Sequence, residues 1–382
     1  MSVIAPRVLI LTASYGSGHN RVAWAVASAA AAAGACPRVV DHFRELVHPA
    51  FDRLSRGLYY WILRWAPALW GGAYWLSDQL PITSPLLLGM NRLGLLGLGR
   101  LLQKELPDFV VSVHPTPAGA LSELRARGFP AVPHITVFTD FVAHTQWIHP
   151  GVDWYCVPAE PIKNDVTARG VPRERVVVTG VPVAPEFSEP LARSAARLAL
   201  GLSPRLPVLL VMAGSLGSLG RLMTAVRVIR DLPFSVQALV VTGQDSRLAA
   251  RLKETLRGTG GRIRVFTYSN SVRQLMAASD LLVTKAGGVT LAEALAAELP
   301  IVCFGSLPGQ ESRNERFAAM TGVALRACDA GELGHVLSLA LTNPEIIRNL
   351  RRKIREIRRP DAARAVLECL SGSAFSVAER AS

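Results

Sequence analysis

The sequence predicts an α/β protein with two halves, each a parallel sheet covered by helices. Short apolar segments alternate with helical segments along most of the 382 residues, which is the pattern of parallel strands joined by right-handed crossovers. In each half a glycine turn follows an apolar segment, at Ser14–Asn20 and at Lys285–Gly288. The length also favours two domains, because a single hydrophobic core rarely grows this large.

The first half is expected to contain strands separated by helices. An alanine-rich segment, Val22–Ala33, follows the first glycine turn and predicts a helix. The strands are predicted at Arg7–Ala13, from Val39 to Asp41, and at Phe109–His114, His134–Asp140, Trp154–Val157 and Val176–Gly180.

A stretch in which proline recurs and hydrophobic periodicity is lost begins at Val181 and predicts a linker. The second half then continues with strands predicted at Val208–Met212, Ala238–Gly243, Arg262–Phe266, Leu281–Thr284 and Ile301–Phe304. We therefore expect an N-terminal domain at 1–182, a linker at 183–205, a second domain at 206–358, and a C-terminal helix and tail at 359–382. Two such domains that face each other leave a cleft at the carboxyl ends of both sheets.

The turn at Gly287 and Gly288 is a candidate phosphate site. Glycine lets the backbone approach a ligand closely, and the helix expected from Val289 presents free N–H groups and the positive end of its dipole. Glu293, one turn inside that helix, could face a ribose diol. The alternative is an ordinary strand-to-helix turn, which many α/β proteins contain.

A polar loop and its continuation, Pro308–Asn314, follow the next strand and favour the ligand-binding interpretation. Gln310, Glu311 and Asn314 supply the amide and carboxylate groups that read sugar hydroxyls. A phosphate site, a diol reader and a sugar reader within about thirty residues predict a nucleotide-sugar pocket.

Composition limits the classes of partner and compartment. The net charge of +13 points to nucleic acid, an anionic membrane or a phosphorylated substrate, although no basic helix or aromatic–basic platform of a nucleic-acid binder is present. Apolar residues make up 50% of the chain, which excludes a disordered protein. The five cysteines are scattered without a C-x-x-C pair, and the N-terminus lacks a secretory pattern, so a reduced cytosolic setting is expected.

The segment 51–102 breaks the α/β rhythm and is rich in aromatic and leucine residues. Proline and charged residues interrupt it too often for a membrane-spanning helix. Because Trp and Tyr favour the headgroup level and Arg pairs with anionic lipid, we expect a surface that lies on a membrane. The alternatives are an insertion that packs in the core and a dimer interface. The residues concerned are Tyr59, Tyr60, Trp61, Trp65, Trp70, Tyr74, Trp75, Arg92 and Arg100.

These motifs together resemble those of a known family. The opening Thr12–Asn20, the block Thr139–His144 with Trp147 and Val152–Tyr155, the turn at Ala286–Thr290 with Glu293, and Pro308–Glu311 with Asn314 are similar to the monogalactosyldiacylglycerol synthases and the bacterial processive diacylglycerol glucosyltransferases. The likeness runs from about residue 7 to 325, and the spaced set is specific where each motif alone is not. The first glycine loop departs from the plant members, which have three glycines before the histidine.

The resemblance implies a GT-B fold and an inverting transfer of glucose or galactose from a UDP-sugar to diacylglycerol or glycosyl-diacylglycerol. It places the proposed catalytic histidine at His19, whose alternative role is to cap the helix or orient the acceptor. Asp140 could orient His19 or act as the base itself, and His144 is a candidate for acceptor contact. We expect peripheral attachment to the cytoplasmic face of the cell membrane.

Residue-by-residue matching also implies a donor site. The residues expected to hold the UDP-sugar are Gly18, Gly214, Ser215, Gly217, Thr267, Tyr268, Gly287, Gly288, Thr290, Glu293, Gln310, Glu311 and Asn314. No cofactor and no tightly bound metal are expected, because His114, His134, His144 and His149 form no metal-binding pattern and no Asp-x-Asp motif occurs.

Three rival functions share part of this pattern. An enzyme that transfers N-acetylglucosamine to a peptidoglycan lipid intermediate would share the donor half. A UDP-sugar 2-epimerase has a similar two-domain fold but no need for the aromatic segment. A nucleic-acid binder is suggested by the charge alone, and its binding to DNA would collapse with salt.

Overall fold

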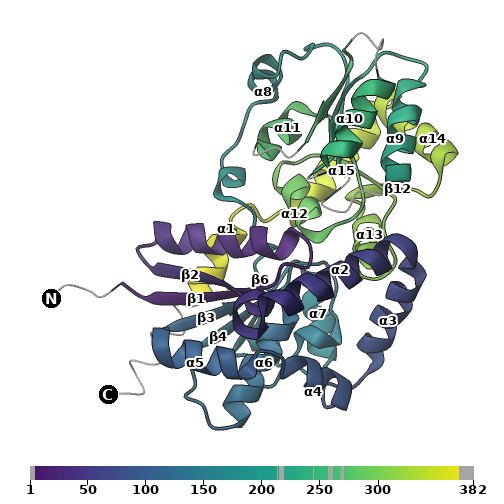
Figure 1. Ribbon diagram of the computed structural model, residues 1–382. Helices are drawn as coiled ribbons and strands as arrows, with labels where there is room; N and C mark the ends of the chain where they lie inside the picture. Colours follow the sequence, from purple (N-terminus) through teal and green to yellow (C-terminus); the bar gives the residue numbers. More distant parts are fainter. Residues whose placement is uncertain are drawn as a thin grey trace. The chain divides into compact units, whose positions relative to one another are not determined.

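The structure is a computed structural model that describes residues 5–212, 214, 219–243, 245–256, 261–267 and 271–369. It contains two six-stranded sheets, in which each neighbouring pair of strands is parallel (Figure 1). Helices alternate with the strands along the chain. The predicted α/β class with two parallel sheets is therefore confirmed.

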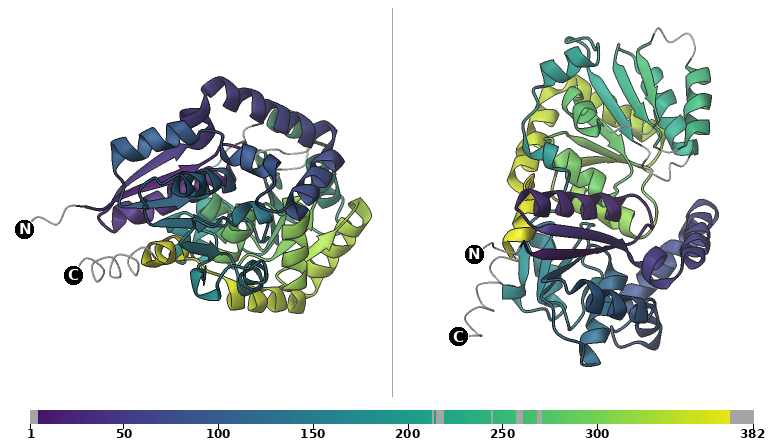
Figure 2. Two further views of the ribbon diagram at one scale, coloured as in Figure 1. Left: turned by 90° about the horizontal axis from the view of Figure 1, so that it is seen from below. Right: turned by 60° about the vertical axis from the view of Figure 1, so that its left-hand side comes forward.

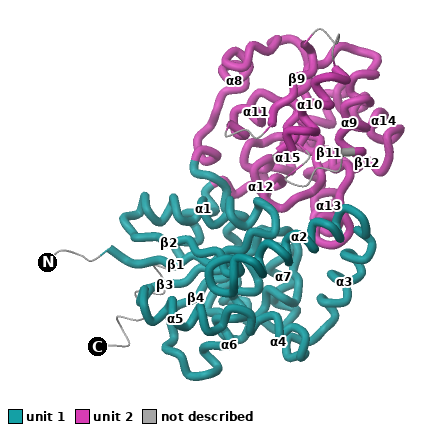
Figure 3. Tube along the Cα trace, viewed as in Figure 1, with its two compact units in different colours: residues 1–185, 361–382 teal, residues 186–360 magenta. Residues whose placement is uncertain are grey.

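The chain divides into two compact units. The first comprises Met1–Pro185 together with Asp361–Ser382, and the second comprises Glu186–Pro360 (Figure 3). The strand order is β2-β1-β3-β4-β5-β6 in the first unit and β12-β11-β10-β7-β8-β9 in the second. In each sheet the strand order reverses beside the strand that comes first in the sequence, β1 in the first sheet and β7 in the second. Such a switch point is where open α/β sheets bind ligands.

The strands are short and mostly buried, as expected for parallel sheets covered on both faces. The first sheet contains β1 (Arg7–Thr12), β2 (Cys36–Asp41), β3 (Phe109–Ser112), β4 (His134–Val137), β5 (Trp154–Val157) and β6 (Val176–Val178). The second contains β7 (Val208–Met212), β8 (Gln237–Val241), β9 (Ile263–Phe266), β10 (Leu281–Thr284), β11 (Ile301–Phe304) and β12 (Ala324–Ala327).

Helices cover both faces of the first sheet. Leu9 and Leu11 of β1 point to a cluster formed with α5 and α6, so Ile10 between them faces the other side, where α1 packs (Figure 1). The helices of this unit are α1 (Gly18–Ala32), the π-helix η1 (His42–Val47), α2 (Pro49–Trp65), α3 (Pro67–Gln79), α4 (Pro85–Asn91), α5 (Leu95–Glu105), α6 (Pro115–Ala126), η2 (Thr145–Trp147), α7 (Glu160–Ala168) and η3 (Arg173–Arg175).

The core of the second unit lies between its sheet and three helices. Leu209 and Val211 of β7 pack with apolar residues of α9, α10 and α14, including Ile229, Leu252 and Leu337. The helices of this unit are α8 (Arg193–Ala199), α9 (Leu219–Arg230), α10 (Ser246–Thr255), α11 (Val272–Ala278), α12 (Gly288–Ala296), α13 (Gln310–Met320), α14 (Ala330–Thr342) and α15 (Pro344–Ile357).

The stretch 183–205, predicted as a linker, contains structure of its own. It includes the short helix η4 (Pro185–Ser188) and α8. Arg197 of α8 is buried, donates to the carbonyl of Ala278 over 2.9 Å, and pairs with Asp280 at 2.5 Å. This charged contact joins α8 to the second unit, which sequence periodicity could not show because the partners lie eighty residues apart.

The chain returns to the first unit at its end. Residues 362–369 form a helix in the first unit (yellow in Figure 2). The Cys369 thiol interacts there with the buried Cys156 thiol of β5, and this contact raises the pKa of Cys156. The C-terminal helix is thus part of the fold that positions the first sheet.

Buried polar contacts anchor the aromatic segment. The Asp78 carboxylate at the end of α3 is 6% exposed and accepts hydrogen bonds from the Thr145 backbone N–H (2.9 Å) and from the Arg169 guanidinium (3.0 Å). A buried carboxylate is stable only with such partners. The end of α3 is therefore tied to η2 and to the residue that follows α7. No helix in the described part of the chain is long and apolar enough to span a bilayer.

Candidate functional site

The glycine turn of the second unit lies where β10 ends and α12 begins. Gly287 is the N-cap of α12 and no side chain caps this helix end. The Gly287 N–H donates to the Lys285 carbonyl over 2.7 Å, which closes the turn. The first N–H groups of a helix without a side-chain cap are available to an anion, and Gly288 and Thr290 lie in this first turn.

Two side chains form hydrogen bonds to the backbone of Ala286 in this turn. The Ala286 N–H donates to Ser306 Oγ over 3.1 Å, and the Ala286 carbonyl accepts from Asn314 Nδ2 over 3.0 Å. Asn314 is fully buried. Its amide therefore supports the glycine turn, and its predicted hexose contact stays a prediction that requires the side chain to become accessible.

The predicted diol and sugar readers lie near the same turn. Glu293 is in α12 with only 1% of its surface exposed, so its predicted ribose contact stays a prediction that requires the carboxylate to become accessible. Gln310 opens α13 and is half-buried. The preceding Gly309 has φ of 100°, which favours glycine at this entry to the helix.

Glu311 has an unpredicted partner. Its Oε1 pairs with Lys285 Nζ at 2.5 Å, and its Oε2 accepts from the Leu307 N–H over 2.9 Å. The Lys285 and Glu311 side chains are 15% and 12% exposed. The carboxylate predicted to bind hexose thus joins the loop after β11 to the glycine turn.

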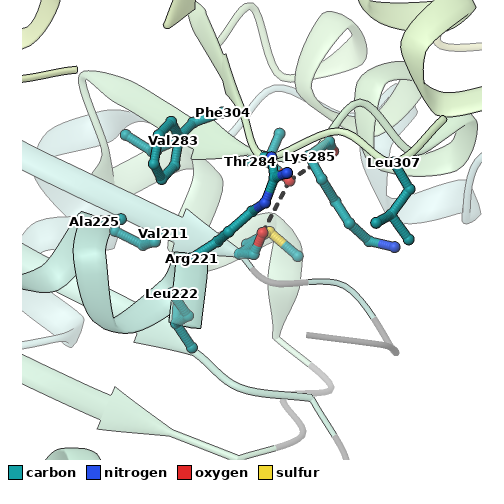
Figure 4. A pocket seen from close by; sticks show the side chains of 11 residues that line it. Val211, Arg221, Leu222, Ala225, Val283, Thr284, Lys285, Phe304 and Leu307 are labelled. Carbon is teal, nitrogen blue, oxygen red and sulfur yellow. Dashed lines mark hydrogen bonds between the residues drawn. The ribbon is translucent and has the colours of Figure 1, made fainter. Parts of the chain in front are cut away.

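A pocket opens beside this ion pair at the carboxyl ends of β7, β10 and β11. Its lining includes Arg221, Thr284, Lys285 and Gly305 (Figure 4). Its volume of about 40 Å³ admits roughly three water molecules. The Thr284 hydroxyl lies within hydrogen-bond distance of the carbonyls of Met212 (2.9 Å) and Lys285 (3.0 Å). It thereby joins the ends of β7 and β10 at one side of the pocket.

The remaining donor residues are only partly described. Gly214 follows β7 with φ of 69°, and Thr267 is exposed just after β9. Ser215, Gly217 and Tyr268 lie outside the described residues, so their predicted roles stay predictions. Gly18, also predicted on the donor side, is the first residue of α1 in the first unit.

His19 is held at the carboxyl edge of the first sheet. Its Nδ1 lies 2.8 Å from the Val113 carbonyl at the end of β3 and 3.1 Å from Thr139 Oγ1. Because a carbonyl only accepts, Nδ1 carries the proton and Nε2 carries the lone pair. This tautomer makes Nε2 the atom that could take a proton from an acceptor hydroxyl.

The surroundings of His19 keep the imidazole neutral. Burial lowers the pKa of His19, while the Asp140 carboxylate and the Val113 carbonyl partly offset this by raising it. His114 lies against it with ring centroids 4.8 Å apart, and burial lowers the pKa of His114 well below its usual range. His19 and Asp140 thus interact electrostatically, and their roles in the transfer stay predictions.

His144 has a structural position. Its Nδ1 accepts from the Gln146 N–H (3.1 Å), so Nε2 carries the proton and donates to the Tyr74 carbonyl (3.1 Å). The side chain is 2% exposed. It ties η2 to α3 through both ring nitrogens, and the predicted acceptor contact stays a prediction that requires the ring to leave these partners.

His134 and His149 are also buried. Burial lowers the pKa of His134 to about 3 and that of His149 to about 4. Among the residues that the structure describes, no group of three or more His, Cys, Asp or Glu could hold a metal ion.

The structure divides the predicted membrane residues into two sets. Tyr59, Tyr60 and Trp70 face inward: the Tyr60 hydroxyl accepts from the Gly16 N–H (3.2 Å), and Tyr59 packs on Trp70 with ring centroids 5.0 Å apart. These three are half-buried and support the first glycine loop. Their predicted lipid contact stays a prediction.

The second set is exposed and apolar. On α2 it contains Leu54, Leu58, Trp61 and Trp65, and on α3 Leu69, Trp75 and Leu76, each at least 54% exposed. The spacing on α2 places its four members on one helix face. We call these seven residues the apolar face. Arg64 lies over the Trp65 ring at 5.3 Å, while Arg92 is exposed and pairs with Glu123 at 3.5 Å, and Arg100 is exposed.

Arg221 and Lys285 were not assigned a role by sequence reasoning. Lys285 directly precedes the Ala-Gly-Gly turn, and that position was an available signal for a phosphate-binding cation. Arg221 gave no signal, because its place beside the turn depends on packing against Gly305, which lies 84 positions away in sequence.

Two family descriptions match consecutive parts of the chain. Residues 19–183 match the family described as monogalactosyldiacylglycerol (MGDG) synthase, and residues 208–315 match the glycosyltransferase family 28 C-terminal domain. The chain is 27% identical over 363 residues to a processive diacylglycerol beta-glucosyltransferase of Bacillus subtilis (strain 168), covering 95% of this chain and 94% of that protein. A protein of the same name from Bacillus thuringiensis (strain Al Hakam) is 29% identical over 370 residues, which cover 96% of this chain and 93% of that protein.

Solved structures share the fold at low identity. MurG of Acinetobacter baumannii superimposes with a TM-score of 0.66 at 16% identity, covering 96% of this chain and all of that one. A UDP-glucosyltransferase from Polygonum tinctorium superimposes with a TM-score of 0.65 at 14% sequence identity, covering 96% of this chain and 99% of that one. A UDP-GlcNAc 2-epimerase from Neisseria meningitidis superimposes with a TM-score of 0.62 at 13% sequence identity, covering 96% of this chain and 100% of that one. At such identity the likeness establishes the GT-B type of fold and not the activity.

Proposed function

Because this chain belongs to the family of monogalactosyldiacylglycerol synthases and processive diacylglycerol beta-glucosyltransferases, within glycosyltransferase family 28, we propose that it transfers a hexose from a UDP-sugar to diacylglycerol or glycosyl-diacylglycerol. The chain is a glycosyltransferase of the UDP-sugar-dependent type. The observation that carries the proposal is the match of both domains, in order, in a chain similar along 95% of its length to enzymes named for this acceptor.

The proposed step is a direct displacement with inversion. His19 Nε2 takes the proton of the acceptor hydroxyl, and the acceptor oxygen forms a bond to C1 of the hexose. The bond between C1 and the diphosphate oxygen breaks, and UDP leaves with the electron pair. A base that is neutral at pH 7 suits this role, and the tautomer assigned to His19 supports it.

The proposed donor site is the turn after β10. The N–H groups of Gly288 and its neighbours and the positive end of α12 would stabilise the departing diphosphate. Gln310 would contact the hexose, and Glu293 the ribose. We propose that no tightly bound metal takes part, since cationic and backbone groups gather where the diphosphate would lie.

Membrane attachment is the second part of the proposal. We propose that the apolar face lies in the headgroup region of an anionic leaflet without crossing it, with arginines such as Arg53 and Arg64 of α2 beside it. The exposure of several Trp and Leu side chains on α2 and on α3, which is anchored through Asp78, supports this, because monomers rarely leave such a patch to water.

The apolar face gives a direct prediction. Replacing Trp61, Trp65 and Trp75 together with alanine is expected to weaken binding to anionic vesicles by about two orders of magnitude, at roughly 1 kcal/mol for each partly inserted ring. Co-sedimentation with vesicles measures this. Trp24→Ala is the matched control, because Trp24 is 64% exposed on α1, away from this face. Equal loss from the control, or none from the triple variant, would contradict the proposed surface.

A product assay tests the activity. Purified protein is incubated with diacylglycerol in anionic vesicles and either UDP-glucose or UDP-galactose, and the lipids are analysed by mass spectrometry and by the anomeric proton coupling. A β-linked hexosyl-diacylglycerol from one donor is the expected result, and it names the sugar. Di- and trihexosyl products would show successive transfer.

Other outcomes discriminate the rivals. Transfer of N-acetylglucosamine to a peptidoglycan lipid intermediate, without any hexosyl-diacylglycerol, would replace this proposal by the first rival. Conversion of UDP-N-acetylglucosamine to its 2-epimer without lipid would replace it by the second.

A further inference from the structure

We propose that Arg221 and Lys285 form a two-cation clamp for the donor diphosphate, and that Glu311 holds Lys285 in place until the donor binds. This inference rests on the proposed function and assigns the residues that would neutralise its leaving group. Both cations line the pocket at the carboxyl ends of β7, β10 and β11, directly beside the glycine turn. Figure 4 shows the Arg221 side chain extending from α9 toward Thr284 and Lys285.

Two glycines make room for these side chains. A Cβ on Gly305 would lie 2.6 Å from Cδ of Arg221, and a Cβ on Gly214 would lie 2.5 Å from Cε of Lys285. A Cβ does not approach a non-bonded carbon atom this closely, so any residue larger than glycine would push the cation out of position. Both glycines also have positive φ, of 86° and 69°. The backbone on each side of the pocket is thus shaped around one cation.

The clamp has an anion in place when the donor is absent. Lys285 Nζ pairs with Glu311 Oε1 at 2.5 Å, while Glu311 Oε2 is held by the Leu307 N–H. A half-buried cation needs such a partner. A diphosphate oxygen would take over Nζ, since it offers more charge than a carboxylate, and Glu311 Oε1 would then be released.

This exchange gives Glu311 the role predicted from the sequence. While paired with Lys285, its Oε1 is occupied and cannot accept a hydrogen bond from a hexose hydroxyl. Once the diphosphate binds Lys285, Oε1 becomes available at the entrance of α13, and Oε2 remains fixed on Leu307. Hexose recognition by Glu311 would therefore follow diphosphate binding.

Binding of UDP and of uridine to single variants tests the clamp. We expect Lys285→Ala and Arg221→Ala each to weaken UDP binding about tenfold or more, which is the effect of losing a charge-assisted contact, while uridine binding is unchanged because uridine has no phosphate. Lys285→Arg should restore part of the UDP affinity. Calorimetric titration measures both ligands, and circular dichroism checks that each variant is folded.

A second variant tests the exchange itself. Glu311→Gln removes the competing anion, so we expect UDP to bind severalfold more tightly, although hexose transfer falls. For Arg221→Ala, the matched control is Arg227→Ala, because Arg227 is an exposed arginine of the same helix α9. A merely structural role for Glu311 would weaken UDP binding instead.

The two levels of the proposal fail differently. Unchanged UDP affinity in Lys285→Ala and Arg221→Ala, with the parent protein binding UDP, would overturn the clamp and leave the proposed function standing. A parent protein that binds neither UDP nor uridine would overturn the donor site and the proposed function with it.

Discussion

His19→Ala is expected to reduce kcat for hexose transfer by a factor of about 10² to 10⁴, the usual contribution of a positioned general base. UDP affinity should not change, because the ring lies in the first unit and bonds to Val113. The measurement is the initial rate at saturating donor, together with a UDP titration. His335→Ala is the control, since His335 is exposed on α14. A kcat within threefold of the parent would contradict the assignment of His19 as base.

The pH profile distinguishes His19 from Asp140 as the base. Burial lowers the pKa of His19, so the imidazole is neutral at pH 7 and the rate should fall only on the acid side, below pH 6.5. Asp140→Asn removes a carboxylate that raises this pKa, and the acid limb should therefore move to lower pH while activity persists. If Asp140 were the base, this variant would lose activity as His19→Ala does.

Gly97→Ala is expected to destabilise the protein by about 2 to 3 kcal/mol, in the range of overpacked cores. Gly97 lies in α5, where a Cβ would overlap the Leu46 carbonyl oxygen and lie 3.0 Å from the Leu46 Cα in η1. These are backbone atoms and cannot rotate away. We expect Tm to fall by roughly 5 to 10 °C, measured by thermal unfolding.

Gly89→Ala provides the opposite result in a neighbouring helix. Gly89 lies in α4, and a Cβ there meets nothing within 4 Å. Alanine loses less backbone entropy on folding than glycine, so this variant should gain about 0.5 to 1 kcal/mol. If both variants changed stability equally, the close approach of α5 to η1 would not be the cause.

The sheets could be predicted because parallel strands buried on both faces are continuous apolar runs. Val208–Met212 and Leu281–Thr284 are such runs, and both are strands with the expected parallel pairing. The glycine turn before α12 was also visible locally, since two glycines between an apolar run and a helical segment permit a sharp turn that larger residues would oppose. The aromatic segment was recognisable from composition alone.

The roles of individual polar residues could not be predicted in this way. Asn314 and Glu311 have the chemistry of sugar readers, yet one supports Ala286 and the other pairs with Lys285. His144 was predicted to contact the acceptor, and in this structure it bonds to Tyr74 of α3. Each partner lies 26 or more positions away, so only the folded chain brings the atoms within hydrogen-bond distance.

The sequence by itself determined the class of the fold, the position of the glycine turns and the presence of an aromatic surface, because each depends on local backbone preference or on composition. The tertiary structure decided which aromatic rings face outward, which tautomer His19 adopts, and which cations gather beside the turn. These depend on helix phase, on a carbonyl of another strand, and on the space left by Gly214 and Gly305. Such contacts join distant residues, and a linear pattern does not encode their geometry.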